Sequence, residues 1–167
     1  MSQTTSEKKV SNLIHSLFST QMNDKVKDSL ENIKIQMVQD NEEETQAAMI
    51  IVMPIKVLDI IHQNFTSFKK NLANIFKNYN IFCVREPIYN RLSKGINRNV
   101  QERWIFDLCY PAEVQCRMTE VKNGGTVQIE KVMLERKCDF LQDDFKNMEN
   151  AYKTLTDRTV IYALRHY

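Results

Sequence analysis

The sequence predicts a single α+β domain over residues 1–167, with a central mixed β-sheet, a β-hairpin and flanking amphipathic helices. Three observations predict this class. Several segments carry apolar residues at helical spacing, and short apolar or alternating runs of strand length separate them. The two kinds of segment are interspersed along the chain. Finally, 167 residues is the length of one ordinary domain, and no linker, repeat or second core is evident.

The first element expected is an amphipathic helix. Its apolar positions fall on one helical face and are Val10, Leu13, Ile14, Leu17 and Phe18. Thr4 and Glu7 have the spacing of a capping box, in which each side chain accepts a hydrogen bond from the backbone N–H of the other residue. We expect residues 1–9, which contain this cap, to include a flexible amino-terminal segment.

A short helix and a strand are expected next. Asn23 can cap a helix whose apolar positions are Val26, Leu30 and Ile33. The alternation of Ile33, Ile35 and Met37 is typical of a strand. Ile33 fits both the helical and the strand pattern, so the boundary between this helix and this strand stays open. Residues 39–46 contain four carboxylates, which repel one another when packed, and this patch predicts an exposed connection.

The middle of the chain predicts a strand, helix and strand unit. Residues 47–53 are almost continuously apolar and are followed by Pro54, which indicates a strand buried on both faces at the centre of the sheet. Apolar residues then recur at steps of three or four from Ile55 to Ile75 and predict one long helix. Residues 81–84 form a second short apolar run, so we expect two parallel strands joined by a crossover.

A β-hairpin is expected in the last third of the chain. Alternating apolar residues flank residues 123–125, whose sequence NGG tolerates the positive φ of a tight turn. The apolar phase changes after Ile129, so we expect a β-bulge near Lys131. Residues 160–164 are expected to form a last strand. Before it, Asp139 can cap a last helix, whose buried side is expected to carry Leu141, Phe145, Met148, Tyr152 and Leu155.

Positive charge is concentrated in one segment. Residues 85–103 carry five Lys or Arg against two Glu, an excess larger than the net charge of +2 of the whole chain. Any contact with a polyanion should therefore be local. From charge alone, solvation of this loop and phosphate binding are equally supported. Asn99 and Glu102 have capping-box spacing and predict a short helix at the end of the segment, which Pro111 stops.

Two aromatic residues accompany the basic segment, Tyr89 and Trp104. Their rings could stack on bases, as in proteins that bind single-stranded nucleic acid. Trp104, however, is in helical register with Val100 and Leu108, so we expect its ring to lie in the core.

The sequence does not predict an enzyme. It lacks a glycine-rich nucleotide loop, a Walker lysine, H-E-x-x-H and G-x-S-x-G. His15, His62 and His166 fall on three different elements, and a small hydrolase whose residues are brought together only by the fold is the least favoured of three hypotheses. We therefore expect no catalytic residues, no cofactor and no small-molecule substrate.

Metal sites and membrane segments are not expected either. The cysteines are Cys83, Cys109, Cys116 and Cys138. They are never closer than seven positions, so no C-x-x-C pair predicts zinc, and we expect buried or free thiols in a reducing compartment. The longest apolar run spans nine residues, against the roughly 20 of a membrane helix, and the start MSQTTSEKK has no apolar signal core. We expect an intracellular soluble protein.

Three motifs in a fixed order resemble a known family. They are AMIIVMPIKVL at residues 48–58, LCYPAEVQCR at residues 108–117 and YKTLTDRTV at residues 152–160. Together they resemble the eukaryote-specific small-ribosomal-subunit protein that is number seven of the eukaryotic series. The resemblance implies a structural constituent of the small subunit that binds ribosomal RNA and neighbouring ribosomal proteins during assembly and translation. It also implies a cytoplasmic location on the ribosome, with assembly in the nucleolus.

The resemblance further implies a set of RNA-binding residues. The candidates are Arg85, Arg91, Lys94, Arg98, Arg103 and Arg117. Arg85 and Arg117 match basic positions of the family's motifs, whereas residues 85–98 replace a longer and more basic tract. Cys116 stands where the family usually has Gly. The alternative hypothesis is a non-ribosomal protein-interaction adaptor, in which the first helix binds a partner's groove and the basic loop only aids solubility.

Overall fold

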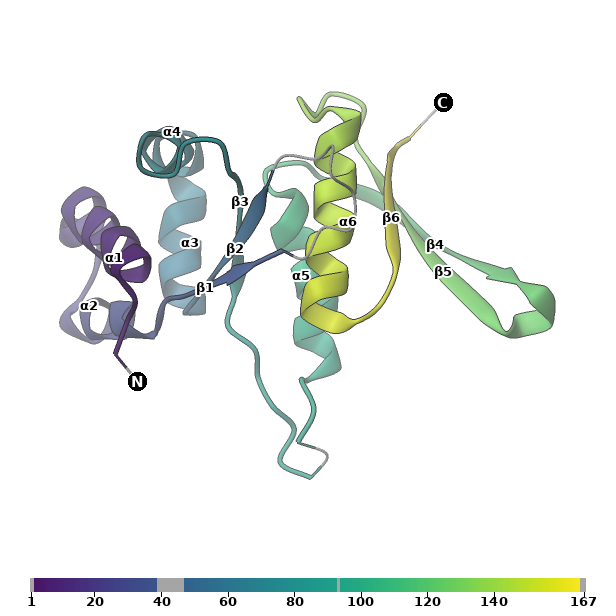
Figure 1. Ribbon diagram of the computed structural model, residues 1–167, viewed down its shortest axis with the longest axis horizontal. Helices are drawn as coiled ribbons and strands as arrows, with labels where there is room; N and C mark the ends of the chain where they lie inside the picture. Colours follow the sequence, from purple (N-terminus) through teal and green to yellow (C-terminus); the bar gives the residue numbers. More distant parts are fainter. Residues whose placement is uncertain (1, 39–46, 93, 166–167) are drawn as a thin grey trace.

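The computed structural model describes residues 2–38, 47–92 and 94–165 and confirms the predicted α+β class (Figure 1). Its strands divide between two mixed sheets of three strands each, with orders β1-β2-β3 and β4-β5-β6. The strands are β1 Lys34–Met37, β2 Ala48–Met53, β3 Asn80–Arg85, β4 Val114–Lys122, β5 Val127–Leu134 and β6 Val160–Leu164. The helices are α1 Thr5–Phe18, α2 Asp24–Ser29, α3 Ile55–Gln63, α4 Phe65–Ile75, α5 Arg98–Cys109 and α6 Gln142–Thr156, with short 3-10 helices η1 Ser19–Gln21, η2 Leu30–Asn32 and η3 Asn123–Gly125.

The elements form four layers. Helices α1 to α4 cover one face of the first sheet, α5 and α6 lie between the two sheets, and the second sheet closes the other side (Figure 1). The second sheet packs its inner face on α5 and α6, and the Tyr162 hydroxyl donates a hydrogen bond to the Ile105 carbonyl at 2.8 Å. One core cluster therefore joins the two sheets through α5 and α6, and a second lies between the first sheet and helices α1 to α4.

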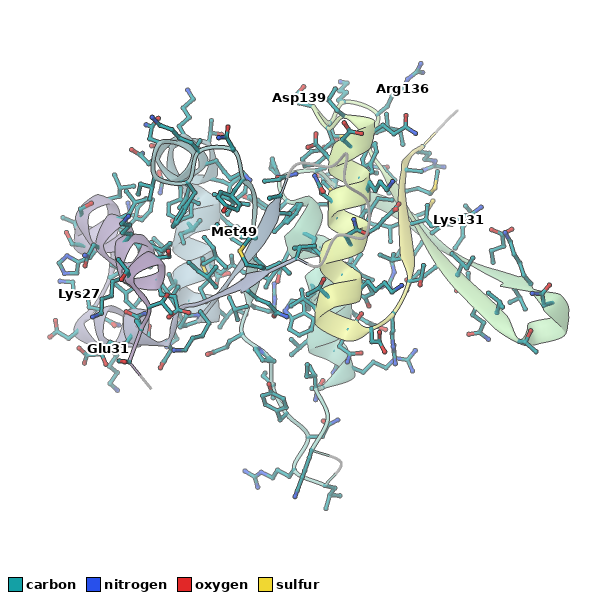
Figure 2. The ribbon with its side chains drawn as sticks, viewed as in Figure 1. Lys27, Glu31, Met49, Lys131, Arg136 and Asp139 are labelled. Atoms are coloured by element: carbon teal, nitrogen blue, oxygen red, sulfur yellow. The ribbon has the colours of Figure 1, made fainter. Side chains whose placement is uncertain are left out.

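Strand β2 is central and buried on both faces, as predicted. It pairs antiparallel with β1 and parallel with β3. Met49 and Ile51 pack among α1 to α4, whereas Ala48 and Ile50 pack against the α5–α6 layer. Figure 2 shows Met49 on the side of β2 that faces α3 and α4. Because both faces are covered, the strand has no polar side to alternate with its apolar one.

The prediction of one long helix over residues 55–75 is wrong. Asn64 adopts φ −130° and ψ 37°, outside the helical region, and separates α3 from α4. Figure 1 shows α4 end on while α3 runs along the page. Ile61 of α3 and Phe68 of α4 nevertheless enter the same core. Apolar spacing indicates which residues face the core, and it does not indicate the direction of the helix axis. The spacing therefore continues unchanged across the bend at Asn64, because the residues on both sides of it face the same core.

Helix α1 begins at Thr5, inside the segment 1–9, and the predicted capping box is confirmed. Thr4 Oγ1 accepts from the Glu7 N–H at 3.2 Å, and Glu7 Oε2 accepts from the Thr4 N–H at 2.8 Å. The other Glu7 oxygen accepts from the Ile35 N–H at 3.1 Å, so this buried carboxylate also ties α1 to β1. Flexibility of residues 1–9 stays a prediction. Burial alone would raise the pKa of Glu7, but the hydrogen bonds from Thr4 and Ile35 and the charge of Lys34 outweigh it and lower the pKa.

We expect Glu7→Ala to lower the free energy of unfolding by about 1 to 3 kcal/mol, because the Thr4 and Ile35 N–H groups lose the buried carboxylate that accepts from them. The folded pKa of Glu7 lies below the ordinary 4.5, so its contribution is present above pH 4.5 and is lost as pH falls through the folded pKa. Urea denaturation between neutral pH and pH 3 should therefore show the two proteins converging in acid. Exposed Glu31 gives the matched control, Glu31→Ala, and an equal loss there would contradict the capping role.

Strand β1 begins at Lys34, after η2, which settles the boundary that the sequence left open near Ile33. The predicted acidic connection at residues 39–46 lies outside the described residues.

The hairpin is confirmed, but its bulge is not where the sequence indicated. The register shifts between Val114 and Cys116 on β4, whereas β5 pairs without interruption. A regular β5 places Ile129 on the face opposite to Val132. The change of apolar phase therefore marks a change of the buried face along the strand, and the prediction of a bulge near Lys131 is wrong.

Two helices begin at other caps than those predicted. Asn97, and not Asn99, caps α5, since its side chain accepts from the Asn99 N–H at 2.9 Å. Asp139 does not cap α6. There Asp144 accepts from the Leu141 N–H at 2.8 Å, and the Leu141 side chain, predicted to be buried, is 73% exposed. Two asparagines, Asn97 and Asn99, compete at the start of α5, whereas the N-cap residue of α6 is the apolar Leu141, which sequence spacing does not indicate.

No described helix meets the length and apolarity that a membrane crossing requires. Cys83 and Cys109 are buried, and burial raises the pKa of each thiol to about 12. These two thiols are therefore poor nucleophiles at neutral pH.

Candidate nucleic-acid interface

The predicted basic loop forms a projection, residues 86–97, which we call the basic arm. Figure 1 shows it between β3 and α5, extending well beyond the body of the molecule. Its two sides are joined by an isolated β-bridge between Tyr89 and Ile96, and the Asn90 N–H donates to the Gly95 carbonyl at 2.7 Å. Lys94 adopts a positive φ of 55°, which turns the chain back toward the body.

Two candidate cations lie near the end of the basic arm. Arg91 and Lys94 are exposed, and no ion pair joins either side chain to another described residue. Leu92 between them is fully exposed, and Tyr89 is 61% exposed. The arm therefore holds two positive charges and an apolar tip away from the body, an arrangement that leaves all of them available to a partner.

Two further candidates lie on α5, where the arm ends. Arg98 is the first residue of the helix, its side chain is 77% exposed, and it lies 3.8 Å from Glu102 in a loose i,i+4 pair. Arg103 is exposed and lines a hollow of about 170 Å³ with Ile88 at the base of the arm. An exposed pair of this length contributes little stability, so Arg98 can exchange its partner for a phosphate at small cost.

Arg85 is already engaged inside the protein. Its Nε and Nη2 donate to the two carboxylate oxygens of Asp107 at 2.8 and 2.9 Å, and its backbone N–H donates to Asp107 Oδ2 at 3.2 Å. Hydrogen bonding to Asp107 raises the pKa of Arg85. The Trp104 Nε1–H donates to the Arg85 carbonyl at 2.8 Å. These contacts satisfy the free edge of β3 at Arg85 and fix α5 against the strand.

Asp107 is the residue that sequence reasoning missed. Its side chain is only 2% exposed. A signal was available, because Asp107 lies three positions after Trp104 and next to Leu108, on the face of α5 that apolar spacing assigns to the core. A lone carboxylate on a buried helix face implies a buried cation as its partner.

Arg117 on β4 is also paired. Its guanidinium contacts Glu130 of β5, and both side chains are about 30% exposed. Of the six candidates, the structure thus brings Arg91, Lys94, Arg98 and Arg103 together on or beside the arm. Arg85 lines the same hollow as Arg103, and Arg117 lies on the hairpin, but both already have carboxylate partners.

The two aromatic residues have opposite surroundings. Trp104 is 1% exposed and belongs to the core, as predicted, so the stacking alternative is wrong for this ring. Tyr89 lies exposed on the arm.

The described histidines do not form a catalytic cluster. His15 is on α1, and His62, at the end of α3, stacks on Tyr110 with ring centroids 3.7 Å apart. Burial lowers the pKa of His62 and favours its neutral form. Among the described residues, no group of three or more His, Cys, Asp or Glu side chains is arranged to hold a metal ion.

One of the comparisons with known proteins, the family model, agrees with the motifs. No curated protein sequence matches the chain significantly. A solved structure titled "Crystal structure of APE1850" has 13% sequence identity and a TM-score of 0.41, covering 98% of this chain and 100% of that one. The family model described as Ribosomal protein S7e matches residues 1–164. Because this match spans nearly the whole chain, the protein belongs to the ribosomal protein S7e family.

Proposed function

We propose that this protein is a structural constituent of the small ribosomal subunit and that it binds ribosomal RNA through the basic arm and the start of α5. Membership of a ribosomal protein family supports a place in the ribosome and, since such proteins are generally not enzymes, a structural role. The observation that carries the RNA contact is the group of four exposed cations, Arg91, Lys94, Arg98 and Arg103.

The geometry of the arm suits folded RNA. Structured RNA presents phosphates and 2′-hydroxyls across A-form surfaces, and these are bound by shape and charge without a sequence-reading motif. A narrow projection can enter a groove or junction that the body of the protein is too wide to reach. Guanidinium groups then pair with phosphate oxygens in a fork geometry.

Protein neighbours are proposed for the remaining surface. Exposed apolar side chains are distributed over several elements, among them Leu17 on α1, Met37 on β1, Phe106 on α5 and Met118 on β4. In an assembled particle such residues would become buried against adjacent ribosomal proteins. We also propose a cytoplasmic location on the ribosome and assembly in the nucleolus. The non-ribosomal adaptor has no support in the comparisons.

The test is sedimentation of the tagged, full-length chain in a cell extract. We expect it to migrate with small subunits on a sucrose gradient and to leave that fraction after ribonuclease treatment, because its attachment depends on RNA. An adaptor would migrate with a protein partner, and ribonuclease treatment would not change its position on the gradient. That outcome would reject the proposed function.

A further inference from the structure

A polar groove, which we call the hairpin groove, lies beside the arm, between the β4–β5 hairpin and the helices α5 and α6. Its volume is about 530 Å³. One wall is formed by the hairpin and the other by the first residue of α5 and the turn between α6 and β6. The lining side chains are Arg98, Thr119, Gln128, Glu130, Arg158 and Thr159, with Tyr152 also contributing.

The groove lies where two projections meet. Figure 1 shows the basic arm and the β4–β5 hairpin leaving the body in different directions, with the lower ends of α5 and α6 between them. Arg98 belongs both to the base of the arm and to the groove. The proposed RNA surface therefore continues into the groove without a break.

The groove's charge is positive despite one carboxylate. Arg158 follows Asp157, the C-cap of α6 with φ 59°, so a left-handed turn leads into the groove. The Arg158 side chain is exposed and has no ion pair with another described residue. Glu130 is neutralised by Arg117, its partner across the hairpin. Arg98 is held only loosely by Glu102.

The lining favours an RNA backbone over a protein segment. Protein interfaces are centred on apolar and aromatic side chains. Here the exposed lining is polar, with Thr119, Gln128 and Thr159 offering hydroxyl and amide groups. Hydroxyls, amides and guanidinium forks are the groups that contact phosphates and 2′-hydroxyls.

We propose that the hairpin groove is a second RNA-backbone site, in which Arg158 and Arg98 bind phosphates while Thr119 and Gln128 of the hairpin contact the adjacent sugar and phosphate oxygens. This inference rests on the proposed function and adds Arg158 and the hairpin to the RNA surface. A sugar–phosphate backbone would then pass through the angle between the arm and the hairpin.

The experiment measures binding of the purified full-length chain to deproteinised small-subunit RNA across a salt series. Arg158→Glu is expected to weaken binding by about fivefold or more at about 0.15 M salt and to reduce the log–log salt slope by about 1. Gln128→Glu, on the opposite wall, should weaken binding in the same direction. The matched control is Arg136→Glu, an exposed arginine that Figure 2 shows at the opposite end of the molecule from the arm.

The outcomes separate this site from the proposed function. Unchanged RNA affinity for both groove variants, with a loss for Arg91→Glu/Lys94→Glu, would reject the groove and keep the proposed function. If neither the groove nor the arm variants lose affinity, both proposals fail. If the groove variants bind RNA normally but no longer enter small subunits, the groove binds a protein neighbour and the inference is wrong. Circular dichroism melts confirm that each variant is folded.

Discussion

Replacing Asp107 with Ala is expected to lower the free energy of unfolding by about 3 kcal/mol, the lower end of the range for removing one partner of a buried ion pair. The lower end applies because the Arg85 side chain is 21% exposed and can recover some hydration. The loss has two sources. The guanidinium loses two charge-assisted hydrogen bonds, and the Arg85 backbone N–H loses its acceptor.

Urea denaturation at neutral pH measures this change through the shift of the midpoint at constant m-value. Asp139→Ala is the matched control. Asp139 is exposed and makes no helix cap, so its replacement should change stability by less than about 0.5 kcal/mol. The double variant Arg85→Met/Asp107→Leu should recover the part of the loss that comes from the unpaired guanidinium, since an apolar pair can replace a buried ion pair, while the backbone N–H of residue 85 still lacks its acceptor. A loss below about 1 kcal/mol for Asp107→Ala would show that the pair does not hold β3 and α5 together.

The second large effect is expected from reversing three charges of the proposed RNA surface, in the variant Arg91→Glu/Lys94→Glu/Arg98→Glu. Each phosphate contact contributes roughly −0.7 to −0.9 to the slope of log affinity against log salt. Three lost contacts therefore reduce affinity for small-subunit RNA by about 50- to 200-fold at about 0.15 M salt, and flatten the slope by about 2 to 3. Incorporation into small subunits should fall with the affinity.

Stability should not change in this variant, because all three side chains are exposed and only Arg98 has a carboxylate neighbour, at 3.8 Å. A control with the same change in net charge, Lys25→Glu/Lys77→Glu/Arg136→Glu, uses exposed residues outside the arm and groove and should retain most of the affinity. Equal losses in both triple variants would mean that only the net charge matters, and would rule out a localised contact.

The pattern of apolar residues predicted most elements but not their directions. The two-sided burial of β2 could be predicted because a central strand requires apolar residues on both faces. The bend at Asn64 could not, since Ile61 and Phe68 keep helical spacing on either side of it. The change of phase at Ile129 likewise has two explanations in sequence, a bulge or a change of buried face, and only the strand pairing separates them.

The exposed cations of the proposed RNA surface were predicted in part, for a similar reason. Charge density along the chain identified the segment that contains Arg91, Lys94 and Arg98. These side chains are exposed and, among the described residues, unpaired or loosely paired, so their charge does not depend on residues that folding brings from elsewhere in the chain. It could not show that Arg85 is neutralised by Asp107, which is distant in sequence and belongs to another element. Nor could it show that Arg158, in the turn between α6 and β6, lines the same groove as Arg98.

By itself, the sequence determined the fold class and the segment that forms the basic arm, since both depend on composition and spacing along the chain, and its ordered motifs resemble the family that the family model matches. The tertiary structure alone decided which arginines are available to a phosphate and which are held by a carboxylate. The physical reason is that a charge is neutralised by whatever lies within a few ångströms in space, and folding brings those groups together from anywhere in the chain.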